Sequence, residues 1–147
     1  MNIAKEGRVI ALFHALKGRD GRFESDAIEI DEQGIVGDKY YGKNPNRTIL
    51  LTSNDASYGL AASQGITMPF GSLGENIVID INPYHLHAGA QIRIGDTVVT
   101  VTQNCTLCNG LGKVDEKLPE LLKDDRGIFV KTVQGGKIKK GDSVRLL

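Results

Sequence analysis

The sequence has no tryptophan, only two cysteines and four prolines, and aromatic residues make up 5% of its 147 positions. Two cysteines cannot hold a small fold together through several disulfides, so a hydrophobic core has to stabilise the chain, and its length is sufficient for one. Glycine is the exception, because 18 glycines indicate frequent turns. We therefore expect residues 1–147 to form one domain built from many short elements.

The sequence also has no excess of charge of either sign. Lys and Arg together number 18, and so do Asp and Glu. Without a net positive field the chain is not drawn to nucleic acid or to an anionic membrane, so we expect neither as a partner, and any anion site must be local. The first residues lack the apolar core of a signal peptide, and no apolar run could span a bilayer, which leads us to expect a cytoplasmic protein.

Short apolar runs separated by turn residues dominate the sequence. They are rich in β-branched residues or alternate apolar and polar positions with period two, which is typical of strands. Six of these runs are predicted to be strands: residues 9–13, 27–31, 47–51, 76–80, 98–102 and 128–133. Two short helices are predicted over residues 56–63, ahead of Gly65, and over residues 117–124.

Residues 89–98 and 135–144 repeat one pattern, Gly-x-x-Ile-x-x-Gly-Asp followed by a hydroxyl residue and Val. A Gly-Asp pair between apolar positions favours a tight turn, so the pattern predicts two similar antiparallel hairpins. With the other runs, the total approaches about nine short β segments and two helices. Such a series favours a mainly β fold, a closed or nearly closed barrel that leaves no strand edge exposed.

The two cysteines, Cys105 and Cys108, form a Cys-x-x-Cys pair directly after a predicted strand. In a reducing compartment such a pair is typically reactive or metal-binding. A thiolate is the reactive form of cysteine and is favoured by nearby positive charge. The candidate cations are Lys39, Arg47, Lys113 and Arg126.

Two other interpretations of the cysteines remain open. Both could be small buried apolar residues without chemistry. A structural zinc site would need four Cys or His donors, and His85 and His87 would have to complete it. Nothing in the spacing connects these histidines to the cysteines, so we expect no zinc.

Two glycine-rich loops could hold a ligand. Residues 34–42 contain three glycines, which permit a tight loop whose amides and Lys39 could face an anion, although an ordinary turn with solvated Asp38 and Lys39 would have the same sequence. In residues 71–76, Ser72 and Asn76 could bind polar groups or simply cap the start of a strand.

Taken in order, these segments resemble the MOSC family, named after the C-terminal domain of molybdenum cofactor sulfurases. The resemblance covers nearly the whole chain and implies a β-barrel-like fold of antiparallel or mixed strands, similar to the barrel of pyruvate kinase. The matching motifs are Gly34-x-x-Gly37-Asp38-Lys39, Arg47 before an apolar strand, Gly71-x-x-Gly74-Glu75-Asn76-Ile77, Ile94-Gly95-Asp96, the cysteine loop, Arg126-Gly127-Ile128-Phe129 and Gly135-Gly136-x-Ile138-x-x-Gly141-Asp142.

The resemblance also implies roles for individual residues. In the family a cysteine lies five residues after a Gln that closes a strand, and counting from Gln103 selects Cys108. Cys108 would then carry sulfur as a persulfide or contact molybdenum, and Cys105 could resolve the persulfide as a disulfide. Positions implied to bind the cofactor are Asp38, Lys39, Arg47, Glu75, Asn76 and Arg126.

The chain departs from the family pattern at two places. Tyr40 and Tyr41 stand where many members have His after the Gly-Asp-basic motif, which argues against proton transfer there. Asn104 and Cys105 replace the Pro-Arg that often precedes the cysteine, which removes one cation near the thiol.

Three functions follow as hypotheses. In the first, Cys108 accepts sulfur from a cysteine desulfurase-type donor and passes it to molybdenum cofactor or a molybdoenzyme. In the second, the domain binds molybdenum cofactor or another phosphorylated ligand without covalent chemistry. In the third, it is the molybdenum-dependent component of a reductase that acts with electron-donating partner proteins.

Overall fold

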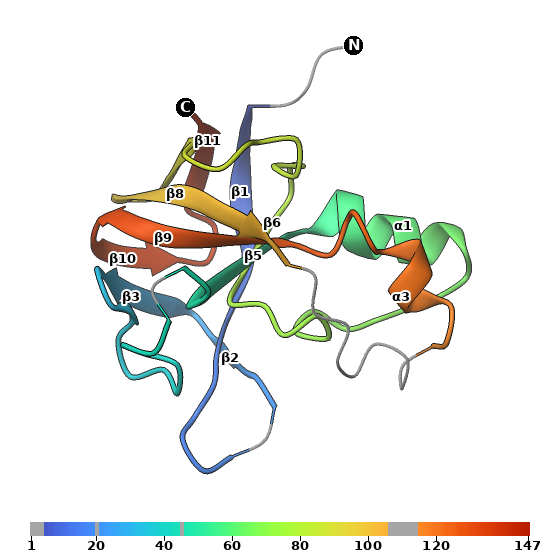
Figure 1. Ribbon diagram of the computed structural model, residues 1–147, viewed down its shortest axis with the longest axis horizontal. Coiled ribbons are helices and arrows are strands. Elements are labelled where there is room, and N and C mark those ends of the chain that lie inside the picture. Colours follow the sequence, from blue (N-terminus) through green and yellow to red (C-terminus); the bar gives the residue numbers. More distant parts are fainter. Residues whose placement is uncertain (1–4, 20, 45, 106–114) are drawn as a thin grey trace.

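The structure is a computed structural model that describes residues 5–19, 21–44, 46–105 and 115–147. Figure 1 shows a barrel of strands with the helices gathered on one side. The elements in these ranges are β1 (Glu6–His14), β2 (Phe23–Ser25), β3 (Ala27–Asp31), β4 (Gly34–Ile35), β5 (Ile49–Ser53), the π-helical turn η1 (Asn54–Tyr58), α1 (Gly59–Ser63), β6 (Ile77–Ile79), β7 (Gln91–Ile94), β8 (Thr97–Asn104), α3 (Leu118–Leu121), β9 (Ile128–Gln134), β10 (Gly136–Lys139) and β11 (Ser143–Leu146).

Seven strands close the barrel in the order β11-β7-β8-β9-β5-β6-β1, because β1 pairs back onto β11. The nine residues of β1 allow this closure: its first part pairs with β11, and its second part pairs with β6 and β2. Only β5 and β6 pair in parallel among these strands, with Leu51 opposite Ile77. A parallel pair needs a crossover connection, and η1, α1 and residues 64–76 provide it. The predicted barrel is thus confirmed, and its strands are mixed.

A second sheet of three strands, β10-β3-β4, lies beside the barrel. The strand pairings confirm the predicted hairpin for the first repeat and show that the prediction was wrong for the second. β7 and β8 pair as expected, but β10 pairs with β3, whereas β11 pairs with β7 and β1. The reason is tertiary, because residues distant in sequence hold the turn after β10: Lys140 N donates to Asp26 O (2.9 Å), between β2 and β3, and Gly141 N donates to Val9 O (2.8 Å) in β1.

The other predicted elements are all present, although the bounds of several differ. Residues 27–31 coincide with β3, whose burial alternates with period two, as the sequence pattern requires. Residues 56–63 correspond to η1 and α1; Ser53 caps the start by accepting from Ala56 N (3.1 Å), and Gly65 has φ +76° just after the end. The second predicted helix is shorter than expected, since α3 spans Leu118–Leu121.

The two largest apolar clusters fill the barrel and the space around the helices. The barrel interior is filled mainly by isoleucine, leucine and valine from every barrel strand, with Leu12, Leu51 and Ile77 fully buried. The second cluster joins the helices to the loop before β6, where Leu73 packs with Leu118 and Leu122.

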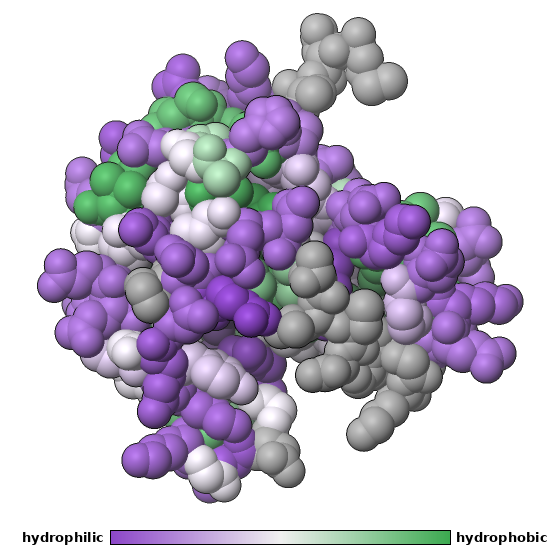
Figure 2. Space-filling model, viewed as in Figure 1, coloured by the Kyte–Doolittle hydropathy of each residue, from purple (hydrophilic) through white to green (hydrophobic). Residues whose placement is uncertain are grey.

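Figure 2 shows hydrophilic residues over most of the face in view. No helix in the described part of the chain is long and apolar enough to cross a membrane.

Candidate anion-binding site

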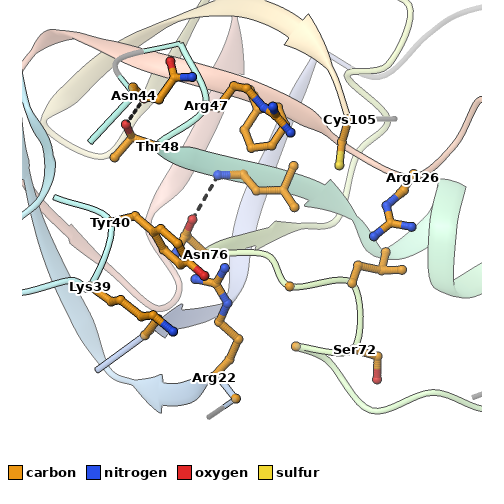
Figure 3. Close-up of a pocket in the computed structure, with 17 residues that line it drawn as sticks. Arg22, Lys39, Tyr40, Asn44, Arg47, Thr48, Ser72, Asn76, Cys105 and Arg126 are labelled. Atoms are coloured by element: carbon orange, nitrogen blue, oxygen red, sulfur yellow. Dashed lines mark hydrogen bonds between the residues drawn. The ribbon is translucent and has the colours of Figure 1, made fainter. Parts of the chain in front are cut away.

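A pocket of about 580 Å³ lies against the outer surface of the barrel (Figure 3). Its size is within the range of about 300–1,000 Å³ typical of small-molecule sites. Leu50, Phe129 and Cys105 form its apolar floor and pack together as a cluster separate from the barrel core. They face outward because side chains alternate along a strand: Ile49 and Leu51 point into the barrel, so Leu50 between them points out.

Four cationic side chains line this pocket: Arg22, Lys39, Arg47 and Arg126. They come from the β1–β2 loop, the long connection between β4 and β5, and the segment before β9. Figure 3 shows them on different sides of the cavity. None of the described residues that line the pocket is Asp or Glu. A chain with no net charge thus has a local positive site, which suits an anion.

Arg126 is the most unusual of the four cations. It is only 6% exposed, and its Nε and Nη1 atoms have no hydrogen-bond partner among the described residues. Burying such a charge without a partner is unfavourable, so this guanidinium is suited to receive an anionic group of a ligand. The chain comes very close to β5 here: a Cβ on Gly127, whose φ is +147°, would lie 3.2 Å from Leu51 O. A side chain next to Arg126 would therefore be strained, which favours glycine there.

The other three cations contact aromatic rings. The Arg47 guanidinium lies 5.5 Å from the centre of the Phe129 ring, on the apolar floor. Tyr40, which is 40% exposed, has Arg22 at 5.3 Å and Lys39 at 5.5 Å from its ring centre. Such contacts attract a cation to a ring face and restrict its side chain without neutralising its charge. These three cations are therefore held at the pocket and remain available to an anion.

Asp38 does not line the pocket, although it was predicted to bind the cofactor. Its buried carboxylate accepts hydrogen bonds from Ala15 N (2.7 Å) and Tyr40 N (2.9 Å). These bonds tie the loop after β4 to the end of β1. Asp38 thus holds Lys39 and Tyr40 in place from behind the pocket wall.

The side-chain polar atoms of Glu75 and Asn76 likewise already make hydrogen bonds within the protein. The fully buried Glu75 carboxylate accepts from Leu73 N (3.2 Å), from the Thr52 hydroxyl (2.9 Å) and from the Tyr58 hydroxyl, and burial raises its pKa. The Asn76 side chain lines the pocket, but it accepts from Leu50 N (3.0 Å) and donates to Phe13 O (3.2 Å).

The structure thus brings Lys39, Arg47, Asn76 and Arg126 together at one pocket and places Asp38 and Glu75 behind its walls. The predicted reactive residue Cys108 and the candidate cation Lys113 lie outside the described residues. Cys105 is 3% exposed in the pocket floor, and its N donates to Gly127 O (2.9 Å).

The sequence did not predict Arg22 as a site residue, and it marked Tyr40 only as a departure from a motif. Arg22 stands between Gly21 and the short strand β2, where no motif marks it. The repeated glycines of that loop were the only signal that it could fold over a site.

No three His, Cys, Asp or Glu residues gather as a metal site within the described ranges, and His85 and His87 are exposed.

One comparison with known proteins identifies a family, and another shows the fold. A family model described as the MOSC domain matches residues 38–145. Among solved structures, the YUAD protein from Bacillus subtilis is similar, with a TM-score of 0.83 and 18% identity over 95% of this chain and 94% of that chain. YiiM from Escherichia coli is similar with a TM-score of 0.67 and 17% identity, over 95% of this chain and 69% of that chain. At these identities the structural likeness shows the fold alone, and the comparison with curated proteins found no match.

Proposed function

This chain belongs to the MOSC domain family, and from that premise we propose that its cationic pocket binds molybdenum cofactor through the phosphate of the pterin. Family membership supports a molybdenum cofactor-related function in general terms. The finer assignment depends on the pocket, where four cations surround an apolar floor.

One observation carries this proposal, the buried and unpaired guanidinium of Arg126. A guanidinium presents several N–H donors in a fixed plane and binds a phosphate through two parallel hydrogen bonds. Arg47 would supply a second positive charge, and the floor of Leu50 and Phe129 would offer an apolar surface to a flat ring. These residues fit a phosphorylated, partly aromatic ligand.

The same residues would do more than hold the ligand. The apolar floor keeps water away from one side of the cavity, which strengthens the attraction between the cations and an anion. Lys39 and Arg22 line the same cavity beside the exposed ring of Tyr40, where they would attract an approaching anion. When bound, the cofactor would supply a redox-active metal, which the protein's own side chains cannot provide.

We further propose that Cys108 carries sulfur. The support is the family resemblance and the position of Cys105, because β8 leads directly into the pocket floor three residues before Cys108 in the sequence. The Cys108 thiolate would attack the outer sulfur of a desulfurase persulfide. The S–S bond of the donor breaks, the donor leaves as a thiolate, and Cys108 becomes the persulfide. A thiolate or persulfide anion is stabilised by positive charge, and Arg47 and Arg126 are the candidate cations that the structure describes.

Binding is tested by loading the protein with molybdenum cofactor and measuring molybdenum and pterin per chain. Arg126→Met should lose at least about tenfold in affinity, since a charge-assisted bidentate contact contributes about 1.5–3 kcal/mol. Arg145→Met is the matched control, because Arg145 lies on β11, outside the pocket, in an exposed ion pair with Glu6 (3.7 Å). Equal loading of wild type and Arg126→Met would reject the proposed site.

Sulfur transfer is tested by mass spectrometry after incubation with a cysteine desulfurase and cysteine. The wild type and Cys105→Ser should gain the mass of one sulfur atom, and Cys108→Ser should not. If wild type gains no sulfur while Cys108 can still be alkylated, the sulfur-carrier proposal is wrong. The binding proposal is then unaffected and depends on Arg126 alone.

A further inference from the structure

The π-helical turn η1 lies behind the pocket and contacts both of its inner walls. Two adjacent buried residues at its end, Ser57 and Tyr58, make these contacts. Turns of this kind are rare and often occur at functional sites, because an extra residue in the turn changes which side chains face the neighbouring chain.

The first wall is the loop of residues 71–74. Glu75 fixes this wall, since its carboxylate accepts from Leu73 N (3.2 Å) on one oxygen and from the hydroxyls of Thr52 (2.9 Å) and Tyr58 on the other. Leu73 itself lines the pocket. Glu75 forms no ion pair with any described residue, so hydrogen-bond donors alone satisfy it. The wall therefore depends on the chain Tyr58–Glu75–Leu73.

The second wall is the segment that contains Arg126. The Ser57 hydroxyl donates to Asp125 O, directly before Arg126, and lies 2.7 Å from the Tyr84 hydroxyl. The Tyr84 hydroxyl in turn accepts from Ser53 N (2.8 Å), at the start of the same turn. Both walls are therefore attached to neighbouring residues of a single turn.

We propose that Glu75 is a positioning residue, and that Glu75 and η1 together set the distance between the two walls and thereby the affinity of the pocket for an anion. This inference rests on the proposed function, because it requires that the pocket binds an anion. Glu75 never contacts that anion; it acts through the backbone of Leu73.

Electrostatics and positioning predict opposite changes in anion affinity when the charge of Glu75 is removed, which makes the inference testable. A carboxylate behind a cationic pocket repels an anion, so its removal by Glu75→Gln should strengthen anion binding if charge decides. Positioning predicts weaker binding, because the amide NH₂ of Gln cannot accept a hydrogen bond and at least one of the bonds to the wall, Thr52 or Tyr58 is lost.

The experiment is a calorimetric titration with inorganic phosphate at constant ionic strength. We expect Glu75→Gln and Tyr58→Phe to weaken phosphate binding by about two- to thirtyfold, the usual size of effects transmitted through packed residues. The double variant should bind no more weakly than Glu75→Gln alone, because both changes break the same chain of contacts. Tyr41→Phe is the matched control, since Tyr41 donates to Asp31 (2.6 Å), which does not line the pocket.

A second control separates positioning from general loss of stability. Ile94→Val removes one methyl group from the fully buried core without touching the pocket, so its phosphate affinity should equal that of wild type. If Glu75→Gln folds poorly, Tyr58→Phe carries the test. Phosphate binding by Glu75→Gln or Tyr58→Phe that equals or exceeds the wild-type value overturns the inference. If folded wild type binds no phosphate, the proposed anion site itself is wrong.

Discussion

Replacing Arg126 by Met should stabilise the ligand-free protein while it weakens anion binding at least about tenfold. Arg126 is 6% exposed, and two of its nitrogen atoms have no partner in the described part of the chain. A residue that is unfavourable for folding and yet buried at a pocket is expected where a ligand completes the structure. The prediction therefore links stability and function through one side chain.

The size of the effect follows from the burial of that guanidinium. A buried polar group left unpaired costs about 1–3 kcal/mol, and apolar replacements of buried charged groups are often stabilising by about 1–4 kcal/mol. Met has a similar length and no unpaired donors. We therefore expect Arg126→Met to raise the free energy of unfolding by about 1–3 kcal/mol, and Tm by about 2–4 °C for each kcal/mol.

The assay is urea unfolding in phosphate-free buffer, repeated with added phosphate. Arg126→Met should have a higher midpoint than wild type with an unchanged m-value. Phosphate should stabilise wild type more than the variant, because the gain from mass action grows with the affinity of the folded state for the ligand. Arg145→Met, at an exposed ion pair, should stay within about 0.5 kcal/mol of wild type. A less stable Arg126→Met protein that phosphate stabilises as much as it stabilises wild type would refute the reasoning.

Three further predictions concern the fold. Gly71→Ala should lower the free energy of unfolding in urea by about 1–3 kcal/mol, because Gly71 has φ +95° and a Cβ there would lie 3.2 Å from the Phe13 ring. Leu12→Ala should cost about 2–5 kcal/mol in the same assay, since Leu12 is fully buried in the barrel core. Burial raises the pKa of Glu75, so the folded state binds its proton more tightly, and stability should fall as pH rises from about 4.3 through the raised pKa. In unfolding measured across that range, Glu75→Gln should lack this fall; an identical pH profile for both proteins would show that Glu75 is not the cause.

Most of the barrel could be predicted from local patterns. The period-two alternation of residues 27–31 predicts β3 with its correct bounds, because one face of that strand is buried and the other exposed. The second Gly-Asp repeat shows the limit of this reasoning. Its local pattern matches that of the first, but Val9 and Asp26, distant in sequence, bind its turn and direct β11 to a different sheet.

The candidate site was predictable only in part, because local patterns show which residues could bind a ligand but not which of them face it. Glycine-rich loops and basic residues mark where a ligand site can form, and Lys39, Arg47 and Arg126 do meet at the pocket. A sequence cannot tell whether a carboxylate faces a ligand or accepts from nearby backbone, and Glu75 does the latter. Arg22 was missed because only the folded β1–β2 loop brings it to the pocket.

The most direct test of the central claim is a crystal structure of the protein loaded with molybdenum cofactor, with anomalous data collected at the molybdenum edge. The account predicts the metal at the pocket and the phosphate of the pterin within hydrogen-bond distance of the Arg126 guanidinium. A cofactor bound elsewhere on the chain, or a phosphate turned away from an Arg126 that stays unpaired, would contradict it.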